Sequence, residues 1–304
     1  EGTSRTRPVS LELGFAATDF GYFIDLGLPQ DPGHNSMFGQ DPEIKRETVF
    51  AGPSPRPSSA LVRRTRTYAE VASDSGRGFD ELTRALPSYR SVLAEYANPE
   101  ALPELAAVRD RLRDWRFYDG FRVDRDAPAR RRQVGTRTPV LSNDGNDLAA
   151  AVQTILEAGF DDLPRAVADA FDGAEISVSS DSGLFELQLH QRGMLRPLRS
   201  AELSDGTLRF LLWAAALTSV DRPALMVLNE PETSLHPDLV APLAAMIVAA
   251  ARTTQVVVVT HSARLRERLA ACDASEVELV KQWGETRIDG QTMLTAPPWD
   301  WGKR

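Results

Sequence analysis

Two continuous apolar runs, separated by one helix-length segment, constrain the fold of this chain more than any other feature. The first run, "ALMVLN", ends at Asn229, and the second, "QVVVVT", ends at Thr260. Between them, "PDLVAPLAAMIVAAA" has the length and composition of a helix. Strands buried on both faces read as unbroken apolar runs, and a strand–helix–strand order favours parallel pairing with a right-handed crossover. The sequence therefore predicts an α/β fold built on a parallel sheet, with antiparallel additions.

Weaker signals surround this unit. Before it, "DLAAAVQTILEAG" and "LPRAVADAFDG" predict helices, and "EISVSSDSGLFELQLHQRG" predicts a hairpin that turns at Ser-Asp-Ser-Gly. A largely apolar, buried helix is predicted from Thr207 to about Val220. After the unit, a helix starts near Ser262, and "EVELVKQ" with "TRIDG" predicts a short hairpin that closes the domain.

The first part of the chain is predicted to be antiparallel. "VSLELGF", "FGYFIDLGL" and "EIKRETVFAG" alternate in part and are separated by Gly, Pro and Asp, and "SALVRRTRTYAEV" predicts a further strand. A helix is predicted around Pro103 to Trp115. We expect three segments: residues 1–72 as an antiparallel β part, residues 73–146 as a helical and Arg-rich insertion, and residues 147–304 as the α/β core.

Bulk properties indicate a cytoplasmic protein. The single cysteine, Cys272, excludes an internal disulfide framework and is expected to be a buried packing residue. No apolar run approaches the roughly 18 residues that a membrane span needs. The N-terminus does not resemble a signal peptide, and it lacks an initiator methionine, so we expect the sequence to begin inside a longer gene product.

Arginines are concentrated between Arg109 and Arg137. This stretch holds ten arginines and five aspartates, a local balance of +5 within a chain of net charge −8. It could form a phosphate-binding face for DNA, or a solvated helix with i,i+4 ion pairs followed by a basic loop. On the first reading, neutralising Arg130, Arg131 and Arg132 should reduce the salt dependence of DNA binding.

Polar side chains follow both apolar strands at the point where each strand ends. The first strand delivers Asn229, Glu230 and Glu232, and the second delivers Thr260, His261 and Ser262. Ligands of open parallel sheets bind beyond the carboxyl ends of the strands. Singly, Glu230 could be a helix-terminal charge and His261 an ordinary strand-end histidine. Together they predict a carboxylate that orients a water molecule and an imidazole that senses a reacting phosphate.

A third polar element begins the apolar helix. "ELSDGTLRF" places four small or polar residues at its N-terminus, where unpaired amides and the helix dipole favour an anion. Taken alone, this pattern is an ordinary helix cap, in which a serine oxygen accepts a backbone hydrogen bond. The four residues are Ser204, Asp205, Gly206 and Thr207.

The order of these motifs resembles a known group of proteins. "LSDGT", then "ALMVLNEPETSLHP", then "VVVVTHS" is similar to the signature loop, the Walker B strand with its D-loop, and the switch-histidine strand of ABC-type ATPase heads. The closest resemblance is to the RecF, SMC and OLD-like branch of predicted AAA-type ATPases, in which a segment like "LSNDGNDLAAAVQTI" also occurs. The resemblance covers about residues 135 to 265.

The resemblance implies a fold and a set of roles. It implies a P-loop NTPase-like head with a mainly parallel core sheet, an antiparallel β-subdomain and a helical insertion. Such heads dimerise around ATP and Mg²⁺, so we expect a homodimer. The implied roles are as follows: Ser204 to Thr207 contact the ATP of a second subunit, Glu230 is the catalytic carboxylate, Ser234, Leu235 and His236 form the D-loop, His261 is the switch, and Asn229 holds the metal indirectly.

Two departures from the family pattern affect hydrolysis. The phosphate-binding loop GxxxxGK[ST] does not occur in the sequence, so we expect this Walker A segment to be supplied by a missing N-terminal part. Asn229 stands where the family carries a metal-binding aspartate. The loss of one charge about 4 Å from Mg²⁺ could cost up to roughly 4 kcal/mol at an effective dielectric near 20, so we expect slow hydrolysis.

Two functions remain open at this stage. One is an ATP-hydrolysing head coupled to DNA maintenance or defence. The other is a non-catalytic, nucleotide-gated module for dimerisation or DNA binding. A third, an OLD-type nuclease, would need a further acidic domain after the head, and we do not expect one.

Overall fold

The computed structural model of this chain describes residues 10–29, 37–73 and 75–292, which belong to two compact units. Unit 1 is Glu1–Arg113 with Gly290–Arg304, and unit 2 is Asp114–Asp289. The predicted insertion over residues 73–146 is therefore not a unit of its own. Its first half completes the core of unit 1, whereas its second half adds a strand to the parallel sheet of unit 2.

Unit 1 is built on an antiparallel meander, as predicted. Its six-stranded sheet follows the chain order, and the "SALVRRTRTYAEV" segment forms two of the strands rather than one. The reason is a tight turn at Arg66, whose φ is +56°. The strands are β1 (Leu11–Ala16), β2 (Phe20–Gly27), β3 (Glu43–Ala51), β4 (Ala60–Thr65), β5 (Tyr68–Ala72) and β6 (Phe79–Thr83).

Short helices complete unit 1. These are a 3-10 turn (Pro57–Ser59), α1 (Val92–Glu95) and α2 (Pro103–Asp114), which confirms the predicted helix. Leu105 and Val108 of α2 are buried in one cluster with Val49 and Val62 of the sheet. This packing assigns α2 to the meander rather than to an inserted domain.

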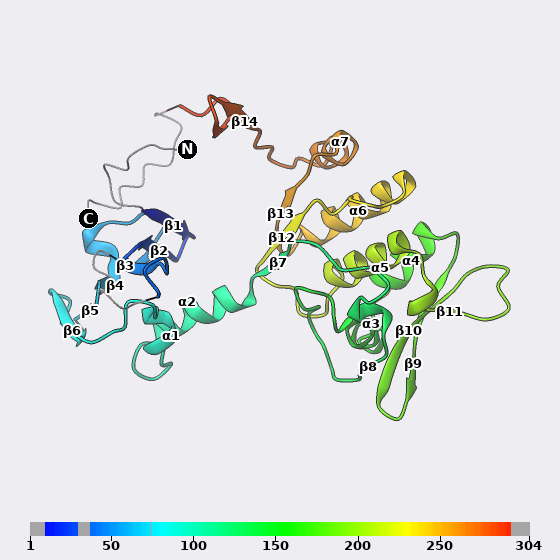
Figure 1. Cartoon of the computed structure of the whole chain (residues 1–304), viewed down its shortest axis with the longest axis horizontal. Coiled ribbons are helices and arrows are strands. Elements are labelled where there is room, and N and C mark those ends of the chain that lie inside the picture. The colour runs from blue at the N-terminus through cyan, green and yellow to red at the C-terminus, as the bar shows by residue number, and fades with distance from the viewer. Residues whose placement is uncertain (1–9, 30–36, 74, 293–304) are drawn as a thin grey trace. The chain divides into compact units, whose positions relative to one another are not determined.

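The core of unit 2 is a three-stranded parallel sheet in the order β13-β12-β7 (Figure 1). The βαβ prediction is confirmed for β12 (Leu225–Asn229) and β13 (Gln255–Val259), and β7 (Arg116–Tyr118) is an unpredicted third strand. The two predicted strands are not buried on both faces. Met226 and Leu228 are fully buried, whereas Val257 and Val259 are 42% and 45% exposed, because α5 and α6 lie on only one side of the sheet (Figure 1).

Five helices of unit 2 share one hydrophobic core. The apolar helix forms as predicted and buries Trp213 among Phe121 and Tyr118. The five helices are α3 (Leu148–Glu157), α4 (Asp162–Ala170), α5 (Asp205–Leu217), α6 (Val240–Ala250) and α7 (Ala263–Ala270). Single 3-10 turns occur at Pro128–Arg130, Ser200–Glu202 and Pro237–Leu239.

A second sheet of unit 2 contains the predicted hairpin, which turns at Ser182 and Gly183. Its strands are β8 (Gln133–Val134), β9 (Glu175–Asp181), β10 (Leu184–His190) and β11 (Leu198–Arg199). The predicted C-terminal hairpin also forms, as β14 (Leu279–Gln282) and β15 (Glu285–Ile288), but as a separate two-stranded sheet.

Two expectations from composition can be compared with the structure. Cys272 is exposed rather than buried, because it follows the end of α7 in a turn whose helix buries only Leu265. No helix among the described residues is long and apolar enough to cross a membrane. The chain's first residues, on which the signal-peptide and truncation expectations rest, lie outside the described residues.

Candidate functional site

The tips of β12 and β13 bring the two predicted catalytic side chains together. The strands pair in parallel with Asn229 opposite Val259, and the backbone N–H of Glu230 donates to the Val259 carbonyl at 2.7 Å. Just beyond the strand ends, the His261 Nε2 lies 3.2 Å from the Glu230 Oε1. Both side chains are accessible to solvent. The geometry therefore presents an imidazole and a carboxylate, in contact, to any ligand at this edge of the sheet.

The turn after β12 has an unusual backbone. Glu230 has a φ of +44° and Ser234 a φ of +62°, a left-handed conformation that non-glycine residues rarely adopt. Such residues cost roughly 1–3 kcal/mol each and cluster at functional sites. The Thr233 hydroxyl donates to the Glu230 Oε2 at 3.2 Å and fixes the direction of that side chain.

Glu232 connects the two strand ends. Its Oε1 accepts hydrogen bonds from the Thr260 hydroxyl and, at 3.2 Å, from the Ser262 backbone N–H. Its Oε2 is buried without a partner among the described residues. The sequence places Glu232 at the strand end, but its role as a brace between the two turns depends on a contact across 28 residues that no local pattern reveals.

The start of α5 has the predicted cap. The Ser204 Oγ accepts a hydrogen bond from the Thr207 N–H at 3.1 Å and lies 2.8 Å from the Thr207 hydroxyl oxygen. Ser204 and Asp205 are exposed. Gly206 packs so closely against the turn after β12 that an added Cβ would lie 3.1 Å from the Ser234 carbonyl oxygen. The loop is therefore a rigid, solvent-facing group of hydroxyls and backbone amides.

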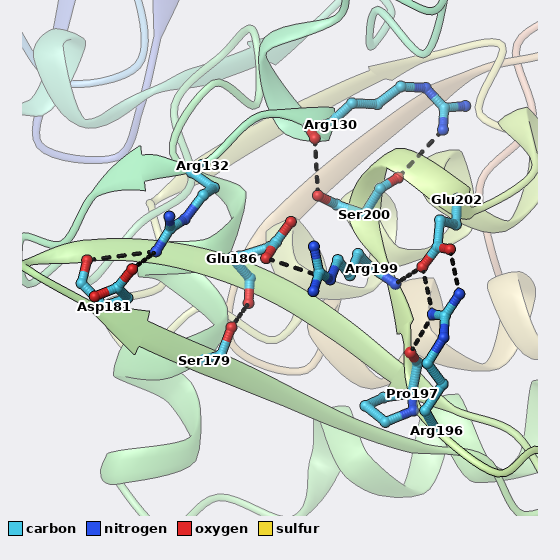
Figure 2. A network of polar contacts seen from close by, with 10 residues as sticks. All are labelled: Arg130, Arg132, Ser179, Asp181, Glu186, Arg196, Pro197, Arg199, Ser200 and Glu202. Carbon is cyan, nitrogen blue, oxygen red and sulfur yellow. Dashed lines mark hydrogen bonds and ion pairs between the residues drawn. The ribbon is translucent and has the colours of Figure 1, made fainter.

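Arg130 supports this loop from beneath, although the sequence suggests an exposed arginine. It is only 8% exposed, and the Ser200 hydroxyl donates to its carbonyl oxygen at 3.0 Å (Figure 2). Its guanidinium donates to four carbonyl oxygens and one carboxylate: Val123 (2.9 Å), Asp124 (3.1 Å), Ser200 (3.2 Å), Leu203 (2.7 Å) and the Oδ1 of Asp205 (2.6 Å). Removing Arg130 would release the loop, so a triple variant containing it does not report on DNA binding.

Two further arginines, Arg196 and Arg199, stabilise the turn before the loop through contacts with Glu202. Glu202 accepts two hydrogen bonds from Arg196, at 2.7 and 2.8 Å, and one from the Arg199 N–H at 3.0 Å (Figure 2). The Arg196 hydrogen bonds, then that of the Arg199 backbone, lower the pKa of Glu202 to about 2. Because the folded pKa is depressed, this contribution to stability is present above the usual glutamate pKa of 4.5 and is lost as the pH falls towards 2.

Asn229, at the predicted metal position, has a side-chain partner on a neighbouring strand. Its Nδ2 donates to the Oδ1 of Asp119 at 2.8 Å. Asp119 directly follows β7, the strand on the other side of β12. The three-residue strand is too short for alternation to predict it, so sequence reasoning counts Asp119 only as one of the aspartates of the Arg-rich stretch.

The side-chain oxygen atoms at the carboxyl ends of β7 and β12 fit a magnesium ion that is bound mainly through water and phosphate. Among the described residues, no group of three or more His, Cys, Asp or Glu side chains could hold a metal by itself. Mg²⁺ in nucleotide sites typically uses one or two carboxylates, its own waters and the phosphates. Asp119 and Asn229 carry side-chain oxygens near the ends of two adjacent strands, as such a site requires.

The Arg-rich stretch is divided between the two units. Arg109, Arg111 and Arg113 belong to unit 1, and the other arginines belong to unit 2. On α2, Arg109 contacts its neighbour Asp110, and Arg111 contacts Asp19 of the meander. In unit 2 four exposed arginines of the stretch pair with scattered carboxylates: Arg122 with Asp124, Arg131 with Asp126, Arg132 with Asp181 and Arg137 with Glu157.

A parallel α/β sheet with polar strand tips and a capped helix start define a candidate nucleotide-binding protein. Residues 3–267 match the family described as "AAA domain, putative AbiEii toxin, Type IV TA system". The match spans most of the sequence, and the chain belongs to this family. Membership confirms the coarse part of the resemblance, a P-loop NTPase-like α/β fold in an ATPase family.

Solved structures show a distant likeness to SMC heads. The Smc head domain with a coiled coil and joint from Pyrococcus yayanosii is 18% identical over 47% of this chain, with a TM-score of 0.39, and the chain spans 28% of that protein. The SMC head domain from Thermotoga maritima is 11% identical over 89% of this chain and 74% of its own length, with a TM-score of 0.36. A SmcHead bound to the C-winged helix domain of ScpA is 9% identical over 92% of this chain and 76% of its own length, with a TM-score of 0.41. A search of curated proteins finds no match.

Proposed function

We propose that this protein is an ATP-binding and ATP-hydrolysing head that dimerises around nucleotide. The observation that carries the proposal is the 3.2 Å contact between Glu230 and His261 at the tips of neighbouring parallel strands. A carboxylate at this position can orient water for attack on the γ-phosphate, and the imidazole can contact the transferred phosphoryl group. Catalysis of this kind depends on positioning, which the Thr233 and Val259 contacts of Glu230 supply.

The exposed loop at the start of α5 supports a composite site. Ser204, Asp205, Gly206 and Thr207 combine a helix dipole, unpaired amides and hydroxyls, which favour a phosphate. Gly206 contacts its own D-loop at Ser234, so the loop is braced from behind and faces solvent. We infer that its ligand is the nucleotide held by a second copy of the chain, which makes the assembly a two-fold homodimer.

The phosphate-binding loop is the part of the site that this sequence does not supply. Parallel sheets are normally covered on both faces. The side chains of Val257, Val259 and Phe117 are 42%, 45% and 51% exposed, on strands β13 and β7. We infer that the segment carrying the loop that binds the β-phosphate packs on this apolar face.

Asn229 favours a second candidate function, a nucleotide-gated module without turnover, since an amide replaces a carboxylate at the metal position. The ATPase family of the chain favours hydrolysis instead. Phosphate release by the complete gene product distinguishes the two. A head that hydrolyses ATP releases phosphate in a Mg²⁺-dependent manner and sediments as a dimer with ATP. Nucleotide binding without Mg²⁺-dependent release would favour the gated module.

DNA binding is a further part of the proposal and rests on exposed arginines of unit 2. Arg131 and Arg137 are 66% and 72% exposed, and their ion pairs with Asp126 and Glu157 are long enough, at 3.5 and 3.3 Å, for a phosphate to displace them. We expect the double variant Arg131→Gln/Arg137→Gln to reduce the log–log salt slope of DNA binding by about 2. Arg165→Gln, on the surface of α4, is the matched control. An unchanged slope in the double variant would show that these arginines do not contact DNA.

A further inference from the structure

Asp119 and Asn229 form a hydrogen-bonded pair at the ends of two neighbouring parallel strands. β7 and β12 run in parallel with Tyr118 opposite Leu228, so the next residues, Asp119 and Asn229, emerge side by side at the same sheet edge. The amide Nδ2 donates to one carboxylate oxygen at 2.8 Å. No hydrogen bond from the described residues reaches the other oxygen of Asp119, which is exposed.

The pair explains why an amide can stand at position 229. A carboxylate there would place two like charges at hydrogen-bond distance, which disfavours ionisation of both. The amide instead donates a charge-assisted hydrogen bond that orients the Asp119 carboxylate. Since its nitrogen is turned to Asp119, the carbonyl oxygen of Asn229 remains available to water or a cation.

Glu230 is not a substitute for the charge lost at position 229. Its two oxygens are engaged by His261, at 3.2 Å, and by the Thr233 hydroxyl, at 3.2 Å. Asp119 is therefore the carboxylate beside Asn229 that has an oxygen free for a ligand. Mg²⁺ in nucleotide sites needs one or two such carboxylates in addition to the phosphates and its waters.

We propose that Asp119 supplies, from β7, the negative charge that holds the Mg²⁺ of bound ATP, and that Asn229 acts as a positioning residue for this carboxylate. The inference rests on the proposed nucleotide site. The negative charge usually carried at the tip of the Walker B strand is then not lost but moved to the neighbouring strand.

Three variants test this assignment: Asp119→Asn, Asn229→Asp, and the exchange Asp119→Asn/Asn229→Asp. The readout is the affinity of the complete gene product for a fluorescent ATP analogue, titrated with and without Mg²⁺, together with a thermal melt to show that each variant folds. Asp119→Asn should weaken the Mg²⁺-dependent affinity about 10- to 100-fold, as loss of a metal-supporting carboxylate does. Binding without Mg²⁺ should change little.

The exchange variant separates a charge effect from a structural one. It keeps one carboxylate and one amide in contact, so Mg²⁺-dependent affinity should return to within a few-fold of the parent. Asp126→Asn, which removes an exposed carboxylate elsewhere in the stretch, should leave the affinity unchanged. If Asp119→Asn keeps full Mg²⁺ dependence, or the exchange fails to restore it in a folded protein, the inference is overturned. If the parent binds no ATP at all, the proposed function itself fails.

Discussion

Replacing Glu230 with glutamine is expected to lower phosphate release by about 10³-fold or more while ATP binding is retained. Glutamine has nearly the same shape and can still contact His261 and Thr233, but it cannot accept a proton from the attacking water. Positioning and charge at the attacking water contribute factors of this size in phosphoryl transfer. Because hydrolysis is what releases the nucleotide-bound dimer, the variant should also accumulate that dimer.

Steady-state phosphate release and sedimentation with ATP measure both effects. Glu157→Gln is the matched control, since it neutralises an exposed glutamate of α3 that pairs only with surface side chains. Turnover near the parent value in Glu230→Gln would mean that another group activates the water.

Replacing Arg130 with methionine is expected to lower the free energy of unfolding by about 3 kcal/mol, since a buried donor group is lost and its acceptors are left without partners. The guanidinium satisfies carbonyl oxygens of two chain segments about 70 residues apart, including those of Ser200 and Leu203. Asp205 is 65% exposed, so the ion pair itself accounts for little of this cost. Denaturant unfolding of the parent protein and of Arg130→Met measures the difference in the free energy of unfolding.

Arg131→Met is the control, because this neighbouring arginine is 66% exposed and its change should stay within about 0.5 kcal/mol. A loss below 1 kcal/mol for Arg130→Met would show that the loop before α5 does not depend on this support. If the loss is as large as expected, nucleotide-dependent dimerisation should weaken as well, since the loop carries Ser204.

The elements with strong periodicity could be predicted from the sequence. Local sequence patterns predict the parallel strands β12 and β13 from their apolar runs, and both strands form. The Ser-Asp-Ser-Gly turn likewise predicts the hairpin, which also forms. The meeting of Glu230 and His261 could also be predicted, because parallel neighbours place their carboxyl ends at one sheet edge.

What could not be predicted depends on contacts between distant residues. The three residues of β7 carry no pattern, so the position of Asp119 beside Asn229 emerges only from the folded sheet. In the sequence, nothing distinguishes Arg130 from its exposed neighbours in the run "ARRR". Its burial depends on contacts with the segment before α5. Val257 and Val259 follow a strand pattern that does not reveal which face the helices cover.

The central claim is that each site combines the strand tips of one subunit with the start of α5 of another. Mixing two inactive variants tests it most directly. Ser204→Arg blocks the loop that a subunit offers to its partner, and Glu230→Gln removes the carboxylate that it uses itself. In a mixed dimer one of the two sites is intact, so an equal, freely exchanging mixture should recover about one quarter of the parent phosphate release. A mixture no more active than the separate variants would contradict the shared site.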